Sequence, residues 1–112
     1  HTSWYTRKAM DEWLYFVQAM ESIKEGDGTM LDNALVYATT DQSYAKIHSI
    51  EGIPMFTAGN AQGRLKTGLH IDGGGGQATR LGYTIMKVLG VDTPTWGTRS
   101  NQTSNVIGEI LT

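Results

Sequence analysis

Cysteine is absent from the sequence, and no apolar run is long enough to form a membrane-spanning helix, which needs about 18 residues. The absence of cysteine excludes disulfides, thiolate metal sites and a cysteine nucleophile. An excess of either charge is also missing, because the formal net charge is −2. Such a chain gives no electrostatic reason to expect nucleic acid or an anionic membrane as a partner.

The residues that are present predict one soluble globular domain spanning 1–112. Apolar residues make up 39% and charged residues 18% of the chain, as in ordinary globular proteins. The length permits one modest hydrophobic core. The chain opens at His1 rather than Met and carries no signal segment, so we expect a processed product or a fragment of a larger domain.

Hydrophobic periodicity predicts two main helices. Apolar residues recur at steps of three and four over about 4–24, with Ser3 as the expected N-cap and a stop at Gly26-Asp27-Gly28. A second helix is expected over Gln77–Leu89, ended by Gly90. A final helical turn is expected within Val106–Leu111.

Two apolar runs predict strands at Asn33–Thr39 and Ile53–Ala58. The first is apolar throughout its centre, which is typical of an interior strand covered on both faces. Pro54 is expected at the start of the second strand, because proline cannot donate to a β-ladder. Leu65–Ile71 is a candidate third strand. The predicted fold class is therefore α/β, with a small mixed sheet of about three strands packed by two helices.

The most promising chemistry lies between the first two strands. Asp41 follows the first apolar run and His48 precedes the second. Adjacent strands would bring a carboxylate and an imidazole to one sheet edge, and such groups bind divalent metals at hydrolytic sites. The alternative is that Asp41 caps the loop and His48 bonds to backbone carbonyls, because the D-x6-H spacing is not itself a metal motif.

Two further features have a chemical and a plain interpretation. His70 either lines the same pocket or is simply a surface residue, and the surface interpretation is favoured. Gly73–Gly76 precedes a predicted helix, where a phosphate can bind backbone N–H groups, but the Lys and Ser/Thr of a P-loop are absent, so a flexible connection is favoured.

Three segments in order resemble a known protein family. They are EGDGTMLDNALVYATTD, IHSIEGIPMFTAGNAQGRLKTGLHI and LGYTIMKVLGVDTPTWG. Together they are similar to the C-terminal part of the bacterial domain-of-unknown-function family fifteen fifty-two, a relative of family fifteen-oh-one. Both families resemble the alkaline phosphatase and sulfatase superfamily.

The resemblance implies an α/β sandwich with two divalent metals, whether zinc, calcium or magnesium, at one edge of the sheet. By position, His48 resembles the histidine before the strand that ends in Ala-Gly, and Asp41, or else Thr40, falls near the family's acidic residue. His1 matches a histidine that begins the family's helical segment, and His70 matches one in the glycine-rich stretch. Such proteins are exported, so the resemblance implies a periplasmic or extracellular location in a bacterium.

The resemblance therefore implies the C-terminal portion of a metal-dependent hydrolase acting on a small phosphate or sulfate ester. The family's nucleophile comes from an earlier segment, so the 112 residues are expected to have little or no activity alone. The alternative is a non-catalytic structural or binding module that forms a homodimer through Trp4, Trp13 or Trp96. Light scattering separates the two interpretations, because a strict monomer counts against the module.

Overall fold

Two helices and two short β-hairpins form the chain, which a computed structural model describes from His1 to Thr112. The helices are α1 (Thr2–Ser22) and α2 (Thr79–Val88). The strands are β1 (Lys24–Glu25), β2 (Gly28–Thr29), β3 (Val36–Thr39) and β4 (Met55–Ala58). Three 3₁₀ turns complete the chain: η1 (Ala45–Ile47), η2 (Arg99–Asn101) and η3 (Gly108–Ile110). The predicted α/β class, the two helices and the final helical turn are confirmed.

The prediction of a three-stranded mixed sheet is wrong. β1 pairs only with β2 and β3 only with β4, both antiparallel, so the molecule contains two separate two-stranded sheets. Leu65–Ile71 does not form a strand, because Leu65 makes a single bridge to Leu111 and the backbone turns at Gly68, where φ is +74°. The Lys66 N–H donates instead to the Ile110 carbonyl at 2.8 Å, which ties this segment to the C-terminus.

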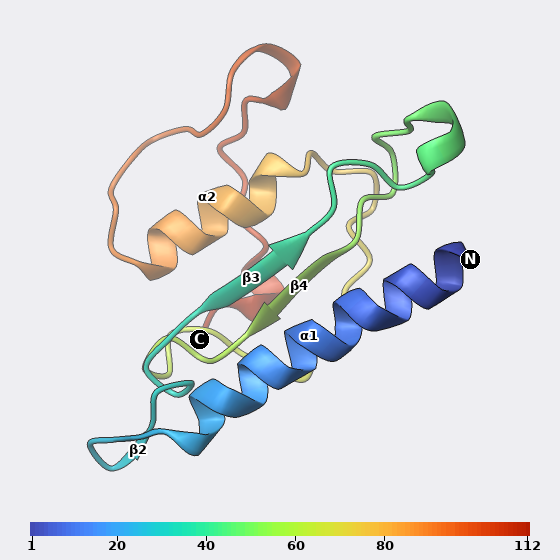
Figure 1. The fold of residues 1–112 in the computed structure, drawn as a ribbon. Helices are drawn as coiled ribbons and strands as arrows, with labels where there is room; N and C mark the ends of the chain where they lie inside the picture. Colours follow the sequence, from blue (N-terminus) through green and yellow to red (C-terminus); the bar gives the residue numbers. More distant parts are fainter.

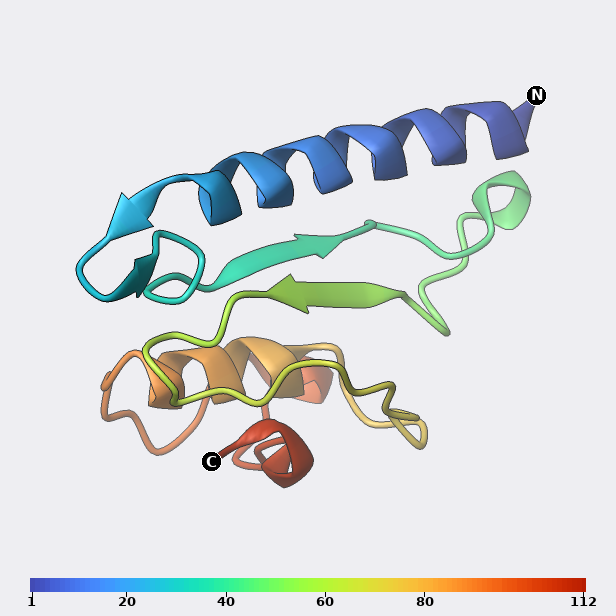
Figure 2. The same cartoon turned by 90° about the horizontal axis from the view of Figure 1, so that it is seen from below.

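The β3–β4 hairpin forms the middle of three layers. Figures 1 and 2 show α1 on one face of the hairpin and α2 on the other. The molecule is flat, measuring 45 × 42 × 20 Å along its principal axes. Because no strand lies beyond β3, it is an edge strand and not the expected interior one, although a helix does lie on each face of the hairpin.

Helix α1 lies on the hairpin without burying any residue. It begins at Thr2 with His1 as N-cap, so the predicted Ser3 cap is wrong, and no side chain caps the first turn. Trp13, Val17 and Met20 are only half-buried, because two strands are too narrow to cover the helix's apolar arc. No helix of the chain is both long and apolar enough to cross a membrane.

The core lies on the other face, beneath α2. Its buried apolar members come from α2, the segment after β4 and the C-terminal turn: Ala61, Leu65, Leu81, Val88 and Ile110. Helix α2 ends as predicted at Gly90, where φ is +78°. There the N–H groups of Gly90 and Val91 donate to the carbonyls of Lys87 and Met86, forming a Schellman motif. The segment after this cap returns to α2 and covers it.

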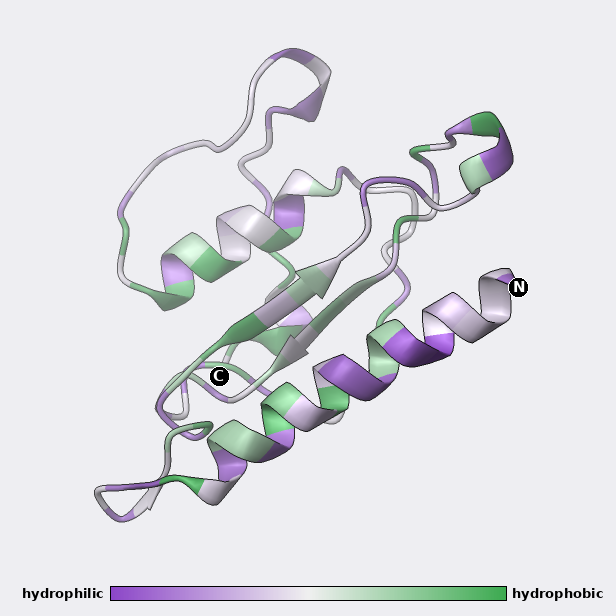
Figure 3. Cartoon of the chain, in the orientation of Figure 1, coloured by the Kyte–Doolittle hydropathy of each residue, from purple (hydrophilic) through white to green (hydrophobic).

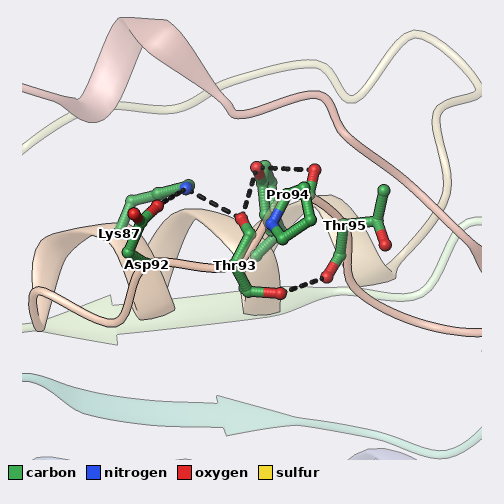
Figure 4. A network of polar contacts seen from close by, with 6 residues as sticks. Lys87, Asp92, Thr93, Pro94 and Thr95 are labelled. Carbon is green, nitrogen blue, oxygen red and sulfur yellow. Dashed lines mark hydrogen bonds and ion pairs between the residues drawn. The ribbon is translucent and has the colours of Figure 1, made fainter.

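Polar contacts hold that returning segment against α2 (Figure 4). The Tyr83 hydroxyl lies 3.0 Å from the Thr93 carbonyl, and Lys87 Nζ donates to the same carbonyl at 2.9 Å. Lys87 also lies 3.4 Å from the exposed Asp92 carboxylate. Partial desolvation lowers the pKa of Lys87, but the neighbouring Tyr83 and Asp92 outweigh this effect and raise the pKa above its ordinary value. The ammonium is thereby held in its charged form as a donor to the segment.

Candidate functional site

The candidate residues gather around one end of the β3–β4 hairpin. We call residues 40–54, which connect β3 to β4, the loop end. The opposite end, where residues 59–65 follow β4 and lie against residues 28–35, we call the turn end. Figures 1 and 2 both place the N-terminus at the same end of the molecule as the loop end. His1, Asp41 and His48 therefore lie at one end, although they come from separate segments.

Asp41 lies two residues beyond the end of β3. Its side chain is exposed and takes part in no hydrogen bond within the chain, so it does not cap the loop. The preceding residue, Thr40, is also exposed, and its carbonyl accepts a hydrogen bond from the Thr39 hydroxyl at 3.2 Å. The plain interpretation of Asp41 as a loop cap is thus not what the structure shows, and the carboxylate is open to solvent.

His48 ends the η1 turn in a left-handed backbone conformation, with φ 52° and ψ 42°. Histidine tolerates this region better than most residues but still with some strain. The loop around it is closed by the Ser43 N–H donating to the Ser49 carbonyl at 2.8 Å and by the Tyr44–Ser49 bridge. The imidazole is exposed and bonds to no backbone carbonyl, so the loop holds its backbone and leaves its ring available.

A groove of roughly 1690 Å³ runs along β4 from the loop end. Asp41, Glu51, His70 and Asp72 line it, whereas Thr40, His48 and His1 lie outside its lining. His70 is exposed and belongs to the lining of the same groove as Asp41. Asp41 and His70 therefore both belong to the groove lining, whereas His48, the other member of the pair on which the sequence argument centred, does not.

The charge of the groove lining is uneven. Two cationic side chains, Lys66 and Arg80, face four carboxylates: Asp41, Glu51, Asp72 and Glu109. The formal balance favours a cation over an anion as the first species to bind there. Arg80 is partly committed elsewhere, because its Nη2 donates to the Val106 carbonyl at 3.0 Å, while its buried Nε has no partner.

The glycine run on the far wall forms a turn. The Gly76 N–H donates to the Gly73 carbonyl at 2.9 Å, and the Asp72 carboxylate accepts from the Gly74 N–H at 2.8 Å. Helix α2 starts at Thr79, three residues beyond the run, rather than at Gln77. The Gly74 N–H is already bonded to a carboxylate, so the segment is a connection and not a phosphate cradle.

A complete metal site is not formed by these side chains. No group of three or more His, Asp or Glu residues is arranged so that it could hold a metal ion. Asp41 and His70 share the groove, and His48 and His1 lie at the same end of the molecule, but the chain does not bring all of them to one point. A metal bound here by the usual number of ligands would need further donors.

Several residues of the segments that carry the family resemblance stabilise the fold at the turn end. The Asp32 carboxylate accepts from the Thr29 N–H at 2.8 Å and from its hydroxyl at 3.2 Å. Asn33 donates to Glu25 at 2.9 Å, which ties the β1–β2 hairpin to the start of the next segment. The LDN motif thus stabilises a turn, which the turn preference of Asp and Asn in the sequence could have revealed.

Gly59 has an equally structural reason to be glycine. Its φ is +85°, and a Cβ there would overlap the Ala34 carbonyl oxygen and lie 2.7 Å from that of Leu31. The chain after it is joined to the same segment, because the Ala61 N–H donates to Ala34 at 3.0 Å. The Ala-Gly that ends β4 therefore marks a close backbone approach.

Comparison with models of protein families, with curated proteins and with solved structures gives no match for this chain.

Proposed function

We propose that the chain is the C-terminal portion of a metal-dependent hydrolase of the alkaline phosphatase and sulfatase type, acting on a small phosphate or sulfate ester. The observation that carries the proposal is the acidic groove along β4, in which Asp41 and His70 are exposed together. The three resembling segments supply the class of reaction. The same resemblance makes the protein an exported bacterial one.

The charge of the groove supports a cation as part of the site. An anionic ester entering a lining of four carboxylates and two cationic side chains would be repelled. A divalent cation reverses that repulsion, and Lys66 and Arg80 then add attraction for the ester. Because the chain supplies no set of three ligands, the remaining donors and the nucleophile belong to a longer polypeptide in this proposal.

The first test measures metal binding by the 112-residue chain, using NMR to monitor the three histidine rings during titration with Zn²⁺. We expect the His70 resonances to shift on titration, and we expect Asp41→Asn to weaken the Zn²⁺ affinity reported by these shifts at least severalfold. His48 should respond next and His1 least. Equal responses of all three rings, unaffected by Asp41→Asn, would show that binding is adventitious and would count against the proposal.

The second test is hydrolysis of p-nitrophenyl phosphate and p-nitrophenyl sulfate with Zn²⁺, Ca²⁺ or Mg²⁺. We expect little or no turnover by the 112-residue chain. A polypeptide extended at its N-terminus by the natural gene should gain a metal-dependent activity that His70→Ala and Asp41→Asn reduce by a factor of ten or more. An extended protein that folds, binds metal and hydrolyses neither ester would overturn the proposed reaction.

A further inference from the structure

The outer edge of β3 is open along its whole length. β3 pairs with β4 on one side only, and no hydrogen bond outside that ladder involves the backbone of Val36–Thr39. The strand carries no charge, proline or bulge, which are the usual devices that prevent edge-to-edge pairing. By contrast, the outer edge of β4 lies beside the groove and Pro54 precedes it.

Helix α1 has apolar side chains that the hairpin does not cover. Met10 and Leu14 lie on one flank of the half-buried Trp13–Val17–Met20 stripe, and Phe16 lies on the other. These three side chains are 40–52% exposed. Figure 3 shows hydrophobic residues along α1 and on both strands of the hairpin, and Figures 1 and 2 together place α1 on one face of that hairpin. A strand added beyond β3 would extend the narrow sheet beneath the helix.

The chain exposes more surface than a compact protein of its mass. Its accessible surface is 8265 Å², whereas a compact monomer of 12.3 kDa exposes about 6,100 Å². The radius of gyration is 15.4 Å, compared with about 13 Å for a compact domain of this length. The excess of about 2,000 Å² exceeds the roughly 800 Å² that each partner buries in a standard interface.

We propose that β3 pairs antiparallel with β3 of a second copy of this chain, about a two-fold axis perpendicular to the sheet. The four strands then run in the order β4–β3–β3–β4. Both α1 helices lie on one face of this sheet and both α2 helices on the other. Such an interface is isologous, so the apolar strand meets itself and neither copy keeps a free β3 edge. The proposed pairing leaves the groove open, because the groove lies along the other strand.

The test compares Tyr37→Lys with Phe56→Lys by sedimentation velocity over a range of concentrations. Tyr37 on β3 is 44% exposed and Phe56 on β4 is 42% exposed, so the two changes place the same charge on similarly exposed side chains of the two strands. The register places the two side chains on opposite faces of the hairpin, because Tyr37 pairs with Thr57 and Phe56 with Ala38. We expect the unaltered chain and Phe56→Lys to be dimers at micromolar concentration. Tyr37→Lys should be monomeric, with its dissociation constant raised at least tenfold, because like charges would oppose each other across the axis.

Circular dichroism of both variants establishes that they remain folded, which the exposure of the two side chains favours. A second measurement identifies the strand. Because the chain has no cysteine, Tyr37→Cys and Ala38→Cys each place one thiol at the proposed axis, and at least one of them should give a disulfide-linked dimer on oxidation. Phe56→Cys should not.

Three outcomes would overturn the proposal. They are an unaltered chain that stays monomeric at 100 micromolar, equal dissociation constants for the two lysine variants, and disulfide formation only at Phe56→Cys. Open-ended aggregation that both lysine variants abolish equally would also overturn it, because the association would then be nonspecific. A chain that dimerises alone but becomes monomeric when extended by its natural gene would assign the β3 edge to another segment of the longer protein instead.

Discussion

The two ends of the β3–β4 hairpin are built differently. At the turn end, backbone groups of residues 59–65 bond to residues 31–34, a carboxylate caps the preceding turn, and Gly59 fits where a Cβ has no room. At the loop end, Asp41, His48 and most of their neighbours are exposed, and the loop is closed by bonds within itself and by the Thr39 hydroxyl of β3, which donates to the Pro54 carbonyl at 3.1 Å. The difference teaches that the resemblance motifs have two separate tasks. Those at the turn end maintain the fold, and those at the loop end are free to bind a ligand.

The strongest test of this difference is Gly59→Ala at the turn end. The substitution places a side chain at φ +85° and forces it into the Ala34 carbonyl, so the backbone must move. Left-handed strain alone costs about 1–2 kcal/mol, and the overlap adds to it. We therefore expect the variant to lose about 3 kcal/mol or more of unfolding free energy, or to fail to fold.

Gly63→Ala is the matched control for Gly59→Ala. Gly63 has nearly the same backbone angle, φ +81°, but a Cβ there meets nothing within 4 Å. This variant should lose only the strain of about 1–2 kcal/mol. Urea unfolding followed by circular dichroism measures both. Equal losses would mean that the close approach at Gly59 contributes nothing.

A second test lies in α2, which packs in the same hydrophobic core as Ala61 and Leu65 of the turn end. The Thr84 hydroxyl is fully buried, donates to the Arg80 carbonyl at 2.7 Å and accepts from the Ile107 N–H at 2.8 Å. Thr84→Val keeps the shape but leaves the Ile107 N–H without a partner. We expect a loss of about 1–3 kcal/mol, measured by urea unfolding.

Thr84→Ser keeps the hydroxyl and removes one methyl group, so its loss should be about 1 kcal/mol and smaller than that of Thr84→Val. The reverse order would indicate that packing, and not the hydrogen bond to the C-terminal segment, determines the role of this residue.

The sequence predicts the elements better than their assembly. The period of α2, its end at Gly90 and the position of Pro54 before β4 follow from local chemistry, and each was correctly predicted. The size of the sheet was not correctly predicted. Leu65–Ile71 was expected to pair as a third strand, whereas only its first residue, Leu65, makes a single bridge to another segment. The apolar centre of β3 predicted an interior strand covered on both faces, whereas in this chain a helix lies on each face but no strand pairs with its outer edge.

The candidate site shows the same limit. The sequence correctly identified the end of the hairpin at which Asp41 and His48 lie, since both belong to one loop. It could not determine that His70, 22 residues beyond His48, shares the groove with Asp41 while His48 lies outside its lining. That arrangement depends on how the segment after β4 folds back, which no local pattern specifies. The turn preference of the LDN motif can be read from the sequence. That this motif lies at the opposite end of the hairpin from Asp41 and His48 cannot.

The smallest changes in unfolding free energy are expected for substitutions at the loop end and in the groove, in contrast to those at the turn end. Asp41→Asn and His70→Ala alter exposed side chains that bond to nothing in the chain, so each should change the unfolding free energy by less than about 0.5 kcal/mol. His48→Gly should behave similarly or stabilise slightly, because glycine relieves the strain at φ 52° while increasing the freedom of the unfolded chain. Thermal and urea unfolding of the three variants measure these changes. If a loop-end variant were to lose as much stability as Thr84→Val, its residue would have a structural task, and the groove would lose its claim to be free for a ligand. If all three retain full stability while Asp41→Asn and His70→Ala alter Zn²⁺ binding, stability and binding are separated along a single hairpin.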